Sequence, residues 1–190
     1  MKDWLAAHWV PGALLMAIAL AALAPPLVGA WGWPVALVYL ASPVYMLHQV
    51  EEHRGDRFRR YVNARMFGGL EALTTADVLW VNIPGVWGVN LAALYAAYYA
   101  GPGYGLVAPY LMLVNALVHC AGAARSRGYN PGLWTACGLF LPLALVALWR
   151  IPASAPQHAL GLALALAIHA AIVVRVARRA SALRSLATAS

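Results

Sequence analysis

The chain has 190 residues, of which 63% are hydrophobic and only 10% are charged, and its mean hydropathy is +0.70. Soluble domains average about 25% charged residues, so this composition excludes a soluble protein and indicates an integral membrane protein. The net charge of +7 does not predict a nucleic-acid partner, because the basic residues lie beside apolar segments, where they act as topology signals. Cys120 and Cys137 have neither CxxC spacing nor the pattern of a secreted disulfide scaffold.

Six apolar segments are long enough to cross a bilayer core of about 30 Å, which takes about 20 residues. They cover residues 9–29, 33–53, 78–100, 104–123, 131–150 and 157–176. Pro84 predicts a kink inside the third segment, because proline cannot donate a backbone hydrogen bond. We therefore predict an all-α polytopic membrane bundle of about six transmembrane helices, with residues 1–190 forming a single domain. The one long loop, 54–77, is expected to hold a basic surface helix over about 58–73.

The basic residues predict the orientation of these segments. Lys2, the arginines of the 54–77 loop, those between the fourth and fifth segments and those after the sixth fall on one side; only Arg150 falls on the other. By the positive-inside rule, we expect both termini and these loops in the cytoplasm. Twelve arginines against one lysine, with abundant alanine, favour a high-GC bacterium. The expected location is the bacterial inner membrane, where membrane lipids are the surrounding partners.

The end of the second segment carries the most informative polar residues of the chain. His48 is followed by Glu51 and Glu52 at positions i+3 and i+4, so a helix crowds all three onto one side. Charge in hydrocarbon is costly and usually marks function, with a partner that stabilises it. The arrangement suits holding a metal ion or moving a proton. We expect His53 to point away from Glu51 and to lie near the membrane surface.

Histidines of three different segments are predicted to lie at one depth. His48, His119 and His169 each stand six residues before a cytoplasmic arginine, which places each about 9 Å inside the same boundary. Asn115 lies one turn from His119 on the same helix face. The predicted result is a polar layer close to one side of the membrane. His169 taken alone is better explained as a histidine that hydrogen-bonds across helices.

The start of the fifth segment is expected to face the same layer. It reads Tyr129-Asn130-Pro131-Gly132, in which Asn130 suits the N-cap and Pro131 suits the first helical position. The positive end of this helix would then point into the layer, and Thr135 follows one turn later. Tyr129 and Thr135 are equally well explained as caps of this helix.

Three motifs appear in a fixed order: His48-x-x-Glu51-Glu52, Asn115-Ala116-x-x-His119 and Tyr129-x-Pro131-Gly132-x-x-Thr135. Together they resemble the HXXEE family of small membrane proteins, over residues 35 to 150. The resemblance names no reaction. It marks seven positions as candidates for a site, namely His48, Glu51, Glu52, Asn115, His119, Tyr129 and Thr135.

The leading interpretation is a metal site. His48, Glu52 and His119 would supply three ligands and leave a fourth position open, as catalytic zinc sites do. A carboxylate with histidines also suits iron or manganese. The order His48-x-x-Glu51 resembles only weakly the reversed zinc-protease motif, in which a histidine directly follows the glutamate.

Metal-free acid–base catalysis is the second interpretation. Paired carboxylates beside a histidine often have separated pKa values, so that Glu51 or Glu52 acts as the base, and Asn115 would stabilise developing negative charge. Sterol isomerases of the emopamil-binding type and the CAAX-protease-like glutamate hydrolases use similar residue types in membrane bundles. Both interpretations predict an enzyme that acts on a lipidic or otherwise apolar small substrate.

Three further interpretations stay open. An ion or small-solute transporter is disfavoured because the sequence has no inverted repeat and its polar layer is one-sided. A membrane subunit without a site of its own is another candidate. Finally, His48, Glu51 and Glu52 would have no chemical role if they only formed salt bridges with arginines at the interface, namely Arg54, Arg57 or Arg65.

Overall fold

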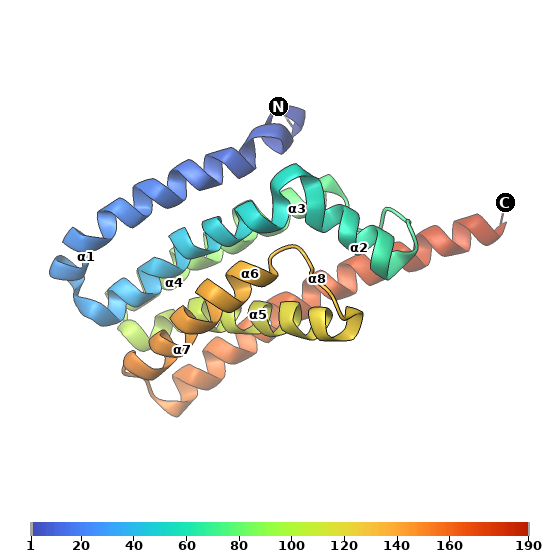
Figure 1. Cartoon of the computed structure of the whole chain (residues 1–190). Helices are drawn as coiled ribbons and strands as arrows, with labels where there is room; N and C mark the ends of the chain where they lie inside the picture. The colour runs from blue at the N-terminus through green and yellow to red at the C-terminus, as the bar shows by residue number, and fades with distance from the viewer. Residues whose placement is uncertain (1, 190) are drawn as a thin grey trace.

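The computed structural model describes residues 2–189, and within this range the chain is predominantly helical, with short connecting turns and no strand (Figure 1). Five helices are long and apolar enough to cross a membrane. The first of them contains α1 (Lys2–His53), in which two limbs meet at Gly32. Gly32 has φ 73° and ψ 164°, a conformation open to glycine, and the chain reverses there (Figure 1). The all-α bundle is thus confirmed, and the six predicted segments correspond to two limbs of α1 and four further helices.

The loop after α1 contains the expected surface helix. The 3₁₀ turn η1 (Arg54–Asp56) leads into α2 (Arg57–Phe67), which ends earlier than the predicted range. The next helix begins with α3 (Thr75–Trp80), where Thr74 and Asp77 form a reciprocal capping box. It continues through the π-helical segment η2 (Val81–Trp87) into α4 (Gly88–Tyr99). The disturbance predicted at Pro84 is this π-helical segment, because proline lacks the N–H that a regular turn needs.

The second half of the chain forms three more long helices. The short η3 (Pro102–Gly105) precedes α5 (Val107–Ser126). The next helix is built from α6 (Leu133–Thr135), the π-helical η4 (Ala136–Phe140) and α7 (Leu141–Arg150). Finally, α8 (Ala155–Ala189) runs for 35 residues and extends well beyond the predicted segment 157–176. Its arginine-bearing tail continues the same helix.

The polar loops gather at one end of the bundle. Figure 1 shows both termini, α2 and the loop between α5 and α6 at that end, and the turn at Gly32 with the loops before α5 and α8 at the other. The segments that carry nearly all the basic residues therefore share one end, as the predicted orientation requires. Helix length and composition indicate a membrane protein, and which side faces the cytoplasm stays a prediction.

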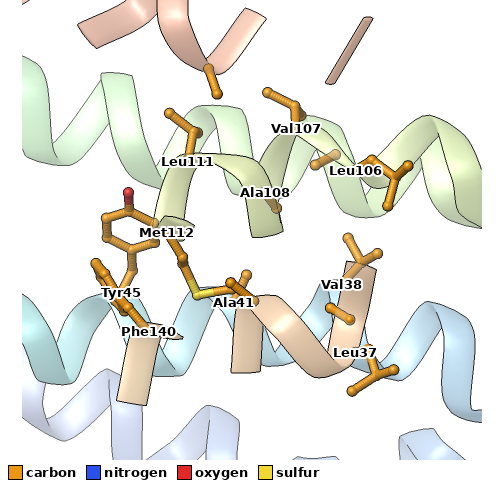
Figure 2. Close-up of a cluster of buried hydrophobic side chains, with 14 of the residues drawn as sticks. Leu37, Val38, Ala41, Tyr45, Leu106, Val107, Ala108, Leu111, Met112 and Phe140 are labelled. Carbon is orange, nitrogen blue, oxygen red and sulfur yellow. The ribbon is translucent and has the colours of Figure 1, made fainter. Parts of the chain in front are cut away.

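The main core lies between the second limb of α1, α5 and α7 (Figure 2). Small residues allow these helices to approach closely: Ala41, Ala108 and Ala144 are fully buried. Tyr45, Met112 and Phe140 fill the space at the end of this core that leads towards His48. The first limb of α1 is peripheral, and its Leu15, Ile18 and Leu23 are exposed.

A satisfied polar cluster joins α1 to η2. The Gln49 side-chain amide donates to Asn82 Oδ1 at 2.9 Å and accepts from Trp87 Nε1 at 2.8 Å. Asn82 Nδ2 in turn donates to the Val78 carbonyl. The polar atoms of this cluster thus find partners within it, so that Gln49 is held away from the neighbouring side chain of His48.

Candidate metal centre

Three buried side chains meet at the end of the core. His48 and Glu52 come from adjacent turns of α1, and His119 comes from α5. Glu52 Oε2 lies 3.6 Å from His48 Nε2, and Glu52 Oε1 lies 3.6 Å from His119 Nε2. The ligand atoms of the three residues all lie within 4.8 Å of one another. We call these three residues the Glu52 centre, and their exposed fractions are only 0%, 6% and 5% for His48, Glu52 and His119.

The hydrogen bond at the far side of the His48 ring determines its tautomer. His48 Nδ1 lies 2.8 Å from Thr135 Oγ1. The Thr135 hydroxyl directs its only hydrogen to Glu51 Oε2 at 2.6 Å or to the Gly132 carbonyl at 3.2 Å, both of which only accept. His48 Nδ1 must therefore carry the hydrogen and donate it to Thr135. The Nε2 atom that faces Glu52 consequently presents a lone pair.

The His119 ring is oriented in the same way by Asn130. Asn130 Nδ2 donates to the His119 backbone carbonyl at 2.9 Å, so its Oδ1 is the atom that faces the ring. His119 Nδ1 lies 2.6 Å from this Oδ1 and donates to it. The Nε2 atom of His119 is therefore also a lone-pair donor towards Glu52. Asn130 is buried, and its two hydrogen bonds lock the ring against α5.

With both imidazoles neutral, the three groups of the Glu52 centre do not hydrogen-bond one another. Two imidazole lone pairs and a carboxylate converge, and the separations of 3.6 Å are longer than a hydrogen bond. Ligands of a tetrahedral zinc ion with bonds of about 2.1 Å lie about 3.4 Å apart; each histidine Nε2 lies 3.6 Å from its nearer Glu52 oxygen, and the three ligand atoms lie within 4.8 Å of one another. Metal-bound histidines usually donate their second ring N–H to a fixed acceptor, as both do here. The arrangement thus has the donor set and the outer hydrogen-bond partners of a group that could hold a metal ion.

Aromatic rings enclose the centre. The Phe140 ring lies 4.2 Å from the His48 ring with an interplanar angle of 32°, and Tyr45 meets the same imidazole edge-on. On the other side, Phe58 of α2 lies 6.2 Å from the His119 ring. These contacts hold the rings in place and lower the local dielectric constant, which strengthens any electrostatic interaction inside the centre.

Gly132 brings the loop before α6 into contact with both imidazoles. Its φ is 100°, in the left-handed region that favours glycine. A Cβ atom at this position would lie 2.7 Å from His119 Cε1 and 2.8 Å from His48 Cε1. Only a residue without a side chain therefore fits between the two rings.

Glu51 lies beside the centre but has a different environment. Its Oε1 accepts hydrogen bonds from the Tyr129 hydroxyl at 2.8 Å and the Trp134 N–H at 3.2 Å. Its Oε2 accepts from the Thr135 N–H at 2.7 Å and the Thr135 hydroxyl. We call Glu51 with these donors the Glu51 cap, because the carboxylate closes the N-terminus of α6. Partial burial is the larger cause, and the hydrogen bond to Glu51 the smaller one, that raises the pKa of Tyr129. Its phenol therefore stays protonated and donates the hydrogen bond.

The predicted position of His53 was wrong. His53 is buried, and its Nε2 lies 3.0 Å from Glu52 Oε2. Its ring packs 5.0 Å from Trp9 and 5.6 Å from Phe58. Both aromatic residues come from other segments, the first limb of α1 and α2, and their packing covers a side chain that α1 alone would leave at the surface.

Two other expectations about polar residues need correction. Asn130 is not the N-cap of the fifth segment: α6 begins at Leu133 after Gly132, and the Asn130 side chain holds His119 instead. His169 does not bond across helices; its Nδ1 contacts the Ala165 carbonyl of its own helix at 2.8 Å. Asn115 lies one turn from His119 on α5, and its Oδ1 is buried without a hydrogen-bond partner in the described part of the chain.

Salt bridges with arginines do not explain the two carboxylates. Among the described residues, neither Glu51 nor Glu52 pairs with an arginine, and Arg57 contacts only the backbone carbonyl of Glu51. The sequence-predicted residues instead form two adjoining groups, the Glu52 centre and the Glu51 cap.

Asn130 and Gly132 were missed as contributors to the centre. The sequence shows an asparagine and a glycine in the loop that follows the segment carrying His119. These two residues indicate a role in the centre only when the loop is known to fold back onto His119. Phe140 carried no signal, because it looks like any core residue of the fifth segment.

Comparison with protein-family models gives one match, to the family described as "Protein of unknown function with HXXEE motif", over residues 39–147. The matched region contains His48, Glu52, His119, Asn130 and Gly132, so every contact that defines the Glu52 centre lies inside it. Curated proteins and solved structures gave no match. Because the family model covers more than half of the chain, the protein belongs to the HXXEE-motif family, as its three motifs indicated.

Proposed function

We propose that the Glu52 centre binds a divalent transition metal ion, zinc, iron or manganese, and that the protein is a membrane-embedded metal-dependent enzyme. One observation carries the proposal: the outer hydrogen bonds of His48 and His119 leave both Nε2 lone pairs facing one carboxylate. A cation is the partner that all three groups favour at once. Two imidazoles and a carboxylate form a common catalytic zinc set and also suit iron and manganese.

A three-ligand site supports catalysis better than a purely structural role. Structural zinc sites are usually closed by four protein ligands, whereas catalytic ones keep a position for water or substrate. When bound by His48, Glu52 and His119, such an ion would supply Lewis-acid chemistry, lowering the pKa of a bound water or polarising a carbonyl or phosphoryl oxygen. The chain itself contributes the orientation of the ligands through Thr135 and Asn130 and, in His53, a further imidazole 3.0 Å from Glu52.

The surroundings favour a lipidic or apolar small substrate. The centre is lined by Phe58, Tyr45 and Phe140, and the helices that carry it expose large apolar side chains such as Leu117, Val118 and Trp134. A molecule dissolved in the bilayer therefore meets the protein on an apolar surface close to the centre. A charged aqueous substrate would have to lose its hydration before it reached the same atoms.

Element analysis of purified protein tests the metal site. We expect close to one metal ion per wild-type chain after supplementation with zinc, iron(II) or manganese, and loss of that ion in His48→Ala and His119→Ala. The matched control is His169→Ala, since His169 stands at the same predicted depth but bonds only its own helix. Wild-type protein that stays metal-free under all three supplements would refute the site.

A metal-free acid–base enzyme is the second candidate, and the contact between His53 and Glu52 supports it. Untargeted mass spectrometry of lipids, from membranes that contain wild type or Glu52→Gln, separates both enzyme candidates from a subunit without activity. If the protein is an enzyme, we expect the abundance of some lipid species to differ between the two membranes. If that difference also requires the bound metal, the metal mechanism is selected. Identical lipid profiles, together with ion or solute flux in liposomes that Glu52→Gln abolishes, would favour a transporter instead.

A further inference from the structure

The two cysteines of the chain lie side by side although 17 positions separate them. Cys120 belongs to α5 and Cys137 to the π-helical η4, and both are free thiols. Their Sγ atoms are 3.7 Å apart, close enough for a thiol–thiol hydrogen bond. The sequence spacing did not indicate this contact; it follows from the packing of α5 against η4.

Both cysteines lie at the outside of the bundle. Cys137 is exposed and Cys120 is partly exposed. Leu117 and Trp134 lie three residues before Cys120 and Cys137, on the same helix faces, and they are 55% and 70% exposed. The thiol pair therefore opens onto an apolar surface, in contrast to the enclosed Glu52 centre.

We propose that Cys120 and Cys137 form a reversible oxidation site whose co-reactant is a hydroperoxide. The more exposed Cys137 sulfur attacks the outer peroxide oxygen: an S–O bond forms, the O–O bond breaks, and the thiol proton leaves with the alcohol or water that is released. The Cys120 sulfur then attacks the resulting sulfenic acid. The S–S bond forms, the S–O bond breaks, and water leaves with the second thiol proton.

The position of this site gives the cross-link a defined mechanical effect. Cys120 directly follows His119, and Cys137 lies two residues after Thr135. A disulfide would therefore tie α5 to the helix that begins at α6, next to His119 and to Thr135, which orients the His48 ring. A reductant would release the tie, because the sulfurs are exposed and close to the surface of the bundle.

The oxidation site is independent of the metal proposal, so its test uses protein treated with a chelator. Wild type in nanodiscs would be exposed to hydrogen peroxide or to cumene hydroperoxide, which partitions into the bilayer, and the remaining thiols would be labelled with maleimide. We expect labelling to fall from two thiols per chain to none, with recovery after dithiothreitol. Peptide mass spectrometry should show the Cys120–Cys137 cross-link. Faster reaction with cumene hydroperoxide identifies a lipid-phase source, and reaction with hydrogen peroxide alone identifies an aqueous one.

Two variants complete the experiment. In Cys120→Ser, Cys137 should form a sulfenic acid that dimedone traps, because its resolving partner is gone. In Cys137→Ser, the less exposed Cys120 should keep most of its maleimide labelling. Full labelling of both wild-type thiols after either peroxide, or disulfides only between separate chains, would overturn the proposal.

Discussion

Glu51 and Glu52 are neighbours in the sequence, yet they belong to regions with opposite electrostatic character. Glu51 accepts four hydrogen bonds from three residues and is half-buried. Glu52 is buried among three imidazoles, two of which present lone pairs to it. The carboxylate of the Glu51 cap is satisfied by four hydrogen bonds, whereas Glu52 faces two imidazole lone pairs and, within the described residues, has the His53 ring at 3.0 Å as its nearest partner.

Helix geometry explains why the two carboxylates separate. Consecutive residues of an α-helix point about 100° apart, so Glu51 at i+3 and Glu52 at i+4 flank His48 on opposite sides. One side faces α6 and the other faces His119 of α5. A paired-carboxylate mechanism would need both groups to face the same substrate. On the metal proposal, Glu51 would position neighbouring groups and Glu52 would bind the ion, and the following predictions test that division.

The largest effect is expected for Glu52→Gln. The substitution keeps the size of the side chain and removes the negative charge that faces both imidazoles. We expect metal affinity to fall by more than about 100-fold, which exceeds the range of about 10- to 100-fold for outer-shell changes. Competition with a chelator of known affinity measures the change. Glu51→Gln is the matched control, and equal losses in the two variants would remove the distinction between the regions.

Gly132→Ala should damage both regions at once. The new Cβ would lie within 3 Å of two imidazole carbons, and alanine is strained at a φ of 100°. We expect a loss of stability of about 2 kcal/mol from the backbone alone, with weaker metal binding in addition. The thermal midpoint in detergent reports the first effect. Gly128→Ala is the control, because its Cβ would meet only the Ser126 carbonyl oxygen at 3.8 Å. Similar midpoints for the two variants would contradict the close approach.

Thr135→Val probes the single hydroxyl that both regions share. Valine matches the shape of threonine but cannot accept the hydrogen bond from His48 Nδ1 or donate to Glu51. Metal affinity should fall by about 10- to 100-fold, since an outer partner of a ligand is lost. Thr135→Ser keeps the hydroxyl and should restore affinity to within a few-fold of wild type. No difference between the valine and serine variants would show that the tautomer of His48 does not depend on this contact.

The smallest effect is expected for Tyr129→Phe, which touches the Glu51 cap alone. One of four donors to Glu51 is lost, and the remaining three keep the carboxylate satisfied. We expect a cost of about 1 kcal/mol in stability and no change in metal affinity. Tyr104→Phe, at an exposed tyrosine of η3, provides the control for the thermal midpoint. A marked loss of metal from Tyr129→Phe would mean that the cap and the centre are not separable.

The sequence predicted most of the fold because membrane burial leaves a strong signal. Apolar length identified the six helical segments, two of which join in α1, and Pro84 identified the irregular turn of the third. Helix ends were less predictable. The arginines after Arg175 read as a tail, yet α8 continues through them, since arginine is a good helix former and its backbone hydrogen bonds need no apolar environment.

The site was predictable only as far as helical periodicity reaches. Depth counting from the arginines brought His48 and His119 to one layer, and their ligand atoms do meet at Glu52. Asn130 and His53 were misplaced because their positions depend on a loop and on aromatic packing from Trp9 and Phe58, which no local pattern encodes. The step of about 100° between consecutive helix residues already indicates that Glu51 and Glu52 point in different directions. Only the position of α6 shows which groups Glu51 contacts.

Gly132 also offers a practical way to sort sequences. A chain that keeps the two histidines and the glutamate but carries any side chain at the corresponding loop position cannot build the same pair of imidazoles, because the space is already filled. A glycine there is therefore a stricter marker of this arrangement of imidazoles than the His48-x-x-Glu51-Glu52 motif, whose first carboxylate caps α6 and lies outside the centre. This one backbone position, which has no functional group, can distinguish chains able to form the same side-chain arrangement from chains that contain only the motif residues.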